Sequence, residues 1–179
     1  MERHFGKALI DTPTLADRIA ALGRQISKDY QGKELLVIGV LKGACLFYAD
    51  LIRKIQVPVT LDFIQAKSYK GRTSSGEVRL LSDPEYADRL ADRHVLVVED
   101  IVDSGVTVQY LRKALLAGKP ASIAICTLLD KPARRRIPVP VEYVGFTIPD
   151  VFVVGYGLDH DESYRNLPYI AALDNIEGG

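Results

Sequence analysis

The chain has 179 residues, and its 23 basic and 23 acidic side chains give a formal net charge of zero. This length, at about 150 residues per domain, predicts a single domain over residues 1–179. Balanced charge argues against a dedicated nucleic-acid-binding protein, and no apolar run approaches the roughly 20 residues of a membrane span. A charged beginning without an apolar block, and only two cysteines, Cys45 and Cys126, argue against a secreted disulfide scaffold. We therefore expect a cytoplasmic enzyme or small-molecule binder with reduced cysteines in its core and no nucleic-acid or membrane partner.

The first third of the chain predicts a helix, a buried strand and a second helix. Apolar residues recur every three or four positions from Thr14 to Tyr30, which is typical of an amphipathic helix. Thr14 followed by Asp17 resembles a capping box at its start. The continuous apolar run Leu35–Val40 favours a strand buried on both faces of a parallel sheet, and a helix is expected from there to about Lys54.

The middle of the chain repeats this alternation. A strand over residues 57–69 should lead into a polar, mobile loop, Tyr69–Glu77, and a short strand over residues 77–81. Two more buried strands are expected at Val95–Asp100 and Ala121–Leu129, with a helix between them that ends near Gly118. Buried strands that alternate with helices predict an α/β protein whose central, mainly parallel sheet is flanked by helices. Ligands bind such sheets beyond the carboxyl ends of the strands.

The segment after the second buried strand carries the richest chemistry. Two adjacent carboxylates, Glu99 and Asp100, precede Asp103, and the run 104–107 then opens a helix. Unpaired N–H groups at a helix start suit a phosphate, while carboxylates beside it can accept from ribose hydroxyls or bind magnesium. The pattern therefore indicates a cup for a ribose 5-phosphate. The competing interpretation is a capped helix after a buried strand, with solvated acids.

The segment VLVVEDIVDSGVT, residues 95–107, resembles the diphosphoribosyl-pyrophosphate motif of the type I phosphoribosyltransferases. It contains neither a GxxxxGK[ST] loop nor a GxGxxG fingerprint. Four further segments resemble, in the same order, the hypoxanthine(-guanine) phosphoribosyltransferases: LKGA at 41–44, KSY at 67–69, DK at 130–131 and PDVFVVGYGLDHDESYRNLPYI at 149–170. Together these matches cover most of the chain. The resemblance implies the type I phosphoribosyltransferase fold, with a small hood built from the chain ends.

The resemblance also implies a reaction in purine salvage. Members transfer a 5-phosphoribosyl group from 5-phosphoribosyl diphosphate to N9 of a 6-oxopurine, through a transition state that resembles an oxocarbenium ion. The expected bases are hypoxanthine and guanine, the products are IMP or GMP and pyrophosphate, and the cofactor is Mg²⁺. Members are homodimers or homotetramers. The sequence ranks neither the two oligomers nor hypoxanthine, guanine and xanthine.

The resemblance assigns a role to each matching residue. Asp103 is the expected general acid/base, while Glu99 and Asp100 bind the ribose and magnesium, and Asp159 binds a second magnesium. The remaining assignments are the 5′-phosphate for Ser104, Gly105, Val106 and Thr107; the pyrophosphate for Lys42, Gly43 and Arg165; the purine for Lys131, Phe152, Val153 and Asp159; and a closing lid for Ser68 and Tyr69.

Several of these residues also have a plainer interpretation. Phe152 lies in an apolar run, where an aromatic side chain is more often core than a stacking platform, and Asp159 begins a DHDE run typical of an exposed turn or a metal cluster. Arg134, Arg135 and Arg136 are expected on a solvated basic face. At the level of function, the alternatives are a phosphoribosyltransferase for another base and a non-enzymatic RNA-binding regulator built on this fold. The latter would need a basic RNA-binding face.

Overall fold

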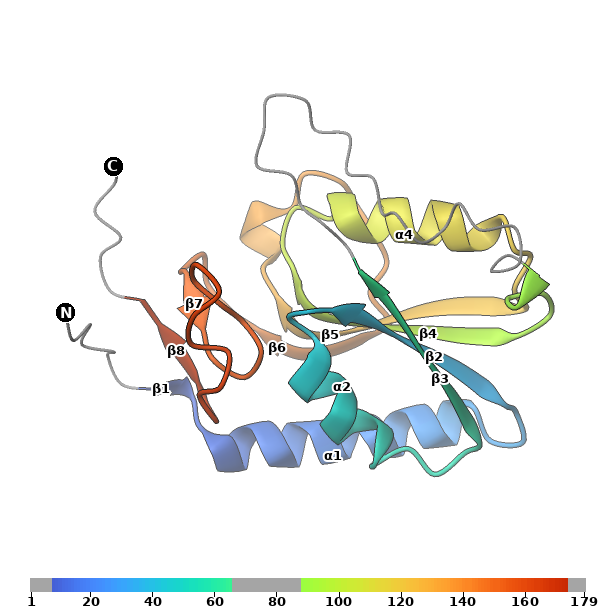
Figure 1. Ribbon diagram of the computed structural model, residues 1–179, viewed down its shortest axis with the longest axis horizontal. Helices are drawn as coiled ribbons and strands as arrows, with labels where there is room; N and C mark the ends of the chain where they lie inside the picture. The colour runs from blue at the N-terminus through green and yellow to red at the C-terminus, as the bar shows by residue number, and fades with distance from the viewer. Residues whose placement is uncertain (1–7, 66–87, 174–179) are drawn as a thin grey trace.

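A five-stranded parallel sheet forms the centre of the molecule (Figure 1). The computed structural model describes residues 8–65 and 88–173. Within them the sheet runs in the order β3-β2-β4-β5-β6, and every neighbouring pair is parallel. The strands are β2 (Leu35–Leu41), β3 (Val59–Gln65), β4 (His94–Val102), β5 (Ser122–Asp130) and β6 (Tyr143–Thr147). The predicted fold class is therefore confirmed.

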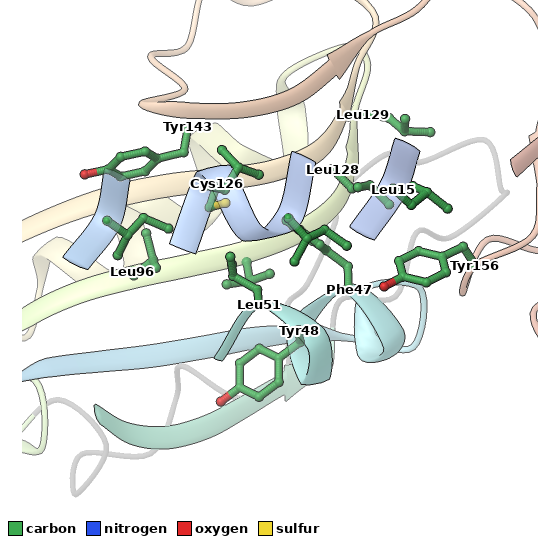
Figure 2. Packing of buried hydrophobic residues seen from close by; sticks show 14 of the residues in the cluster. Leu15, Phe47, Tyr48, Leu51, Leu96, Cys126, Leu128, Leu129, Tyr143 and Tyr156 are labelled. Atoms are coloured by element: carbon green, nitrogen blue, oxygen red, sulfur yellow. The ribbon is translucent and has the colours of Figure 1, made fainter. Parts of the chain in front are cut away.

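Helices cover both faces of this sheet, which explains why its central strands are apolar throughout. Helices α1 (Thr12–Asp29) and α2 (Cys45–Ile52) lie on one face and α4 (Val106–Leu116) on the other (Figure 1). In β2, Leu35 and Val37 belong to the α1/α2 core, whereas Leu36 and Ile38 belong to the α4 core. Figure 2 shows Leu15 of α1 and Phe47 of α2 in the first of these cores, together with Leu96 and Cys126 from the sheet.

Both ends of the described chain build a second, smaller sheet, the hood. Strand β1 (Ala8–Ile10) pairs with β8 (Ile170–Ala172), which also pairs with β7 (Val153–Val154); both pairings are antiparallel. The expectation of a hood made from the chain ends is confirmed. The hood is joined to the central core because Tyr156 and Ile170 pack into the same apolar cluster as α1 and α2.

The two expectations for helix ends have different outcomes, and the one for the start of α1 was wrong. The capping box at Thr14 and Asp17 does not form, because α1 begins at Thr12 and the Asp11 carboxylate accepts from the Thr14 N–H at 2.9 Å. Pro13 fits this earlier start, since the first turn of a helix tolerates a residue without an N–H. At the far end of α4 the expectation holds: the helix ends at Leu116 with Ala117 as its C-cap, next to Gly118, and the left-handed residue that follows is Lys119 (φ 51°).

The remaining expectations for the core and the loops have mixed outcomes. Cys126 is fully buried and Cys45 only partly, and neither is in a disulfide. The expected loop over residues 69–77, the lid residues Ser68 and Tyr69, and the strand over residues 77–81 lie outside the described residues. In the described parts of the chain, no helix has the length and apolar character to cross a bilayer.

Candidate active site

Two adjacent carboxylates near the end of β4 lie at the centre of the site. Strand β4 continues past Glu99 and Asp100 to Val102, two residues farther than predicted. Glu99 is only 8% exposed, and its Oε2 atom has no hydrogen-bond partner. Burial, followed by the charges of Asp100 and Asp103, raises the pKa of Glu99 well above its usual range. Burial also raises the pKa of Asp100 to about 6, although two backbone N–H groups and Arg165 oppose this effect.

These carboxylates could hold a divalent cation together with a phosphorylated ligand. The Glu99 Oε2 atom has no partner, and burial raises the pKa of both carboxyls, so their ionised forms are under-compensated by the protein alone. The described residues contain no cluster of three or more acidic, His or Cys side chains arranged around a metal position. Magnesium needs no such cage, because it commonly uses one or two carboxylates and takes its other ligands from water and substrate phosphates.

The loop from Asp103 to Thr107 brings a helix start to the same edge. Gly105 has φ 84° and directly precedes α4; it has no side chain to cap the first turn, and the Ser104 hydroxyl accepts from the Val106 N–H only at 3.5 Å. The first N–H groups of a helix have no partner within it, so Thr107 lies where an anion can bind. Gly105 also allows a close approach, since a Cβ atom there would lie 2.5 Å from the Ile137 carbonyl oxygen.

Residues 135–137 support this loop from behind. The Arg136 and Ile137 N–H groups both donate to the Ser104 carbonyl oxygen, at 3.0 and 3.1 Å. The Arg135 guanidinium pairs with Asp130 at the end of β5, and both side chains are largely buried. The expectation that Arg135 is solvated was therefore wrong, because a buried carboxylate partner is available within the fold. Arg134 and Arg136 are exposed as expected.

The segment after β2 closes over the carboxylates. The Leu41–Lys42 peptide bond, in the segment predicted to bind pyrophosphate, is cis. Gly43 packs so tightly on Asp100 that a Cβ atom would lie 1.6 Å from its Oδ2 atom. On its other side, the Gly43 carbonyl oxygen would lie 2.1 Å from a Cβ atom at Gly157. Three segments that are distant in the sequence thus meet at positions where side chains do not fit.

A turn over residues 159–165 completes this side of the site. Arg165 donates to the Gly157 carbonyl oxygen at 2.8 Å and pairs with Asp159 at 2.9 Å. Glu162 pairs with the same guanidinium at 3.3 Å and with the Lys42 ammonium at 2.8 Å. The predicted residues Lys42, Asp159 and Arg165 therefore belong to one ion-pair network. Sequence reasoning missed its fourth member, Glu162, although it noted the acidic run that contains it.

The backbone at Glu162 is in an uncommon conformation. Asp161 and Glu162 both have left-handed backbone, with φ of 51° and 61°. His160 and Ser163 close the turn with reciprocal N–H to C=O bonds of 3.2 and 3.1 Å. Such turns usually carry Asn-Gly or Asp-Gly, and each strained residue of another type costs about 1 kcal/mol or more.

Lys131 follows β5 and is joined to the end of β4, because its N–H donates to the Val102 carbonyl oxygen at 2.9 Å. Lys131 is 6% exposed and donates from Nζ to the Val151 carbonyl oxygen. Burial lowers the pKa of Lys131, and the charge of Asp150 opposes this shift. Phe152 is 44% exposed and meets the His160 ring edge-on, with centroids 5.5 Å apart. It is therefore not a core residue, whereas the side chain of Val153, its neighbour in β7, is buried.

A parallel α/β sheet with a helix start and enclosed carboxylates at its carboxyl edge defines a class of protein that binds phosphorylated ligands. The model of the family described as phosphoribosyl transferase domain matches residues 6–161. The chain therefore belongs to the phosphoribosyltransferases, and within them to the hypoxanthine phosphoribosyltransferase family, as its relatives show.

These relatives are similar over almost their whole length. The hypoxanthine phosphoribosyltransferase of Salmonella typhimurium is 47% identical over 174 residues, which cover 96% of this chain and 97% of that protein. A hypoxanthine-guanine phosphoribosyltransferase structure from Bacillus anthracis has a TM-score of 0.87 at 46% identity, and the match covers 96% of this chain and all of the other. A hypoxanthine phosphoribosyltransferase structure from Staphylococcus aureus also has a TM-score of 0.87, at 42% identity, over 95% and 92% of the two chains.

We predict that Gly105→Ala destabilises the protein more than Gly32→Ala. Both glycines have left-handed backbone, but a Cβ atom at Gly32 would meet nothing within 4 Å. Gly32→Ala should therefore show the backbone cost alone, about 1 kcal/mol. Gly105→Ala adds the contact with the Ile137 carbonyl oxygen and should lower the free energy of unfolding in urea by at least about 1 kcal/mol more. Equal losses of unfolding free energy in the two variants would contradict the predicted clash with the Ile137 carbonyl oxygen.

A second prediction concerns pH. Because the folded pKa of Asp100 is raised to about 6, the folded protein holds a proton there that the unfolded chain releases between about pH 4 and 6. This carboxyl therefore opposes folding increasingly as pH rises through that window. Without ligand, Asp100→Asn should leave the free energy of unfolding unchanged near pH 4 and raise it by about 1–3 kcal/mol at pH 7.5. A loss of stability at pH 7.5 would contradict the assignment. The matched control is Asp161→Asn, at a side chain that is 85% exposed.

Proposed function

We propose that this protein is a purine-salvage enzyme that transfers the 5-phosphoribosyl group of 5-phosphoribosyl diphosphate to N9 of hypoxanthine. Guanine is a second base, and the products are IMP or GMP and pyrophosphate. The observation that carries the proposal is that β4 ends in the carboxylates and in the loop before α4, while Lys131 at the end of the neighbouring strand β5 donates its N–H to the Val102 carbonyl oxygen of β4 at 2.9 Å. The names of the relatives support hypoxanthine, and the name of the Bacillus anthracis structure supports guanine as well.

In the proposed donor site, the 5′-phosphate and the diphosphate of the ribosyl donor bind to different segments at the carboxyl edge of the sheet. The 5′-phosphate binds the loop Ser104–Thr107, where N–H groups of the first turn of α4 and the hydroxyls of Ser104 and Thr107 donate to it. The diphosphate binds Lys42, the backbone of Gly43, and Arg165. Glu99 and Asp100 accept from the ribose hydroxyls between these two ends, which is consistent with the Glu99 oxygen that has no protein donor.

Magnesium is the proposed cofactor, held by Glu99 and Asp100 with a second ion at Asp159. When bound, it would neutralise charge on the diphosphate and so favour its departure. The Arg165 guanidinium already lies 2.9 Å from Asp159 and also lowers the pKa of Asp100. Arg165 would therefore favour the ionised form of Asp100, against the larger effect of burial, and it holds the Asp159 carboxylate in place.

Asp103 is the proposed general acid/base. Its side chain is exposed at the mouth of the loop and accepts from the Ser104 N–H, which fixes its orientation. Its charge contributes to the raised pKa of Glu99 and opposes the lowering of the pKa of Lys131, so it lies near both groups. From there it can receive the proton that the purine imidazole ring loses as N9 bonds to the sugar.

The proposed purine-binding residues select the base through hydrogen bonding and stacking. Lys131 donates to the purine O6 atom, and its buried stem and short bond to the Val151 carbonyl oxygen fix the ammonium in place. Phe152 stacks on the base, which is consistent with a side chain that is 44% exposed and meets the His160 ring at 78°. The main chain of Val153 bonds the pyrimidine edge.

Replacing Asp103 by Asn tests the reaction and its acid/base group together. Wild-type protein, hypoxanthine, the ribosyl donor and magnesium should give IMP, followed by ultraviolet absorbance. Asp103→Asn keeps the shape but removes proton transfer, so kcat should fall by about 10²–10⁴-fold while donor affinity changes little. A variant within threefold of wild type would remove Asp103 from this role. Wild-type protein that makes no IMP would contradict the proposed function itself.

Lys131→Ala tests the selection of 6-oxopurines. An ammonium is a donor only, so the 6-amino group of adenine would meet it without an acceptor. Such a contact can discriminate by as much as about 10⁴–10⁵-fold. We expect kcat/KM for hypoxanthine to fall in Lys131→Ala and that for adenine to stay level or rise slightly. Wild-type use of adenine within tenfold of hypoxanthine would contradict the role of Lys131.

We also propose a single cytoplasmic domain over residues 1–179 that assembles as a homodimer or homotetramer.

Two large apolar side chains on the edge strand β3 support the assembly: Leu61 is 45% and Phe63 42% exposed on the same side of the strand. Leu61→Glu should reduce the mass measured by sedimentation equilibrium, whereas Thr60→Glu, on the opposite side, should not. A monomeric wild type, or equal dissociation in both variants, would contradict this surface.

A further inference from the structure

Glu162 lies where the ligand-binding cations meet, yet it is an anion. Its two carboxylate oxygens are divided between two partners: Oε2 lies 2.8 Å from Lys42 Nζ, and Oε1 lies 3.3 Å from a terminal nitrogen of Arg165. These partners belong to segments far apart in the sequence, and both are assigned to pyrophosphate above. A dianionic or more highly charged diphosphate that reaches these cations must therefore compete with a carboxylate of the protein.

The placement of Glu162 is fixed by the backbone rather than by chance contact of long side chains. Its N–H donates to the Asp159 carboxylate at 2.9 Å, and the tight turn around it has left-handed backbone at two non-glycine residues. Structure of this kind is retained where the surrounding fold requires it, commonly at functional sites. The turn presents Glu162 toward Lys42, and the adjacent Asp161 carboxylate pairs instead with His160 at 3.2 Å.

The contact itself is weak enough to be exchanged. The side chains of Lys42 and Glu162 are 58% and 66% exposed, and exposed ion pairs contribute little because water and salt screen them. A diphosphate offers the same two cations several charged oxygens, and charge-assisted bonds to phosphate are stronger than those of one exposed carboxylate. Binding would therefore displace Glu162, which then remains beside the ligand and repels it.

We propose that Glu162 is an internal competitor for the diphosphate, a residue that occupies Lys42 and Arg165 when the ligand is absent and weakens the binding of the donor and of pyrophosphate. The inference rests on the proposed function for the identity of the ligand. It also gives Glu162 a role in release, since the carboxylate returns to the cations as pyrophosphate leaves. A carboxylate that merely oriented the two cations would have the opposite effect on affinity when removed.

Binding of inorganic pyrophosphate in the presence of magnesium, measured by calorimetry on the full chain, tests the proposal. Glu162→Gln keeps the shape and removes the charge, and it should bind pyrophosphate about two- to fivefold more tightly, the range of one exposed ion pair. Asp161→Asn removes the same charge one residue away and should bind as wild type. Affinity for IMP, which lacks the diphosphate, should not change in either variant.

A second background distinguishes competition from a general change in charge. In a Lys42→Met protein the 2.8 Å contact is absent, so the gain from Glu162→Gln should shrink. Affinity of Glu162→Gln equal to or weaker than wild type, or an undiminished gain in the Lys42→Met background, would overturn the proposal. Failure of the proposed function would differ, since wild-type protein would then make no IMP from hypoxanthine whatever the pyrophosphate affinities.

Discussion

The site depends on the close approach of three backbone segments around one carboxylate. Gly43 lies against Asp100, and Gly157 lies against the Gly43 carbonyl oxygen, with no room for a Cβ atom at either glycine. Because nothing larger fits, the loop after β2 and the turn region before residue 159 are held within reach of β4. This contact places Lys42 and Arg165 beside the carboxylates, and so determines where positive charge is available at the edge of the sheet.

The same closeness makes the ligand-free site electrostatically unfavourable. Glu99 and Asp100 are enclosed with raised pKa values, and the nearest positive charges are shared with Asp159 and Glu162. A buried anion without a full set of partners costs free energy that the rest of the core must supply. The compensation lies in the two apolar clusters on either side of the sheet. Such a site is organised for a cationic or hydroxyl-rich ligand before the ligand arrives.

Sequence patterns predicted those parts of the fold that depend on the local order of apolar and polar residues. Continuous apolar runs indicated strands covered on both faces, and β2, β4 and β5 are such strands. The family resemblance placed the loop at Gly105 and the cations Lys42 and Arg165 in one site, and the structure brings them to the same edge. The start of α1 was misplaced because Asp11, Thr12 and Thr14 are all acceptable capping residues, and only the geometry selects Asp11.

The features that sequence could not supply are contacts between distant segments. In the sequence, Glu162 is one acid in a run typical of an exposed turn. Its place in the ion-pair network depends on Lys42, which lies 120 residues away. The run of arginines places Arg135 on a basic face, whereas in the structure it pairs with Asp130. Phe152 lies in an apolar stretch, yet the turn after β7 leaves its ring exposed next to His160.

The hood has a consequence for the order in which the protein can be completed during synthesis. Strand β8 is the middle strand of the hood and the last element of the described chain, whereas all five strands of the central sheet have appeared by Thr147. A ribosome-bound chain could thus assemble the sheet and the phosphate loop while β1 and β7 still lack the strand that joins them. The segment that carries Phe152 would gain its backbone partner only when Leu173 donates to the Phe152 carbonyl oxygen at 2.9 Å. The central sheet would therefore be complete before the hood that fixes the backbone at Phe152.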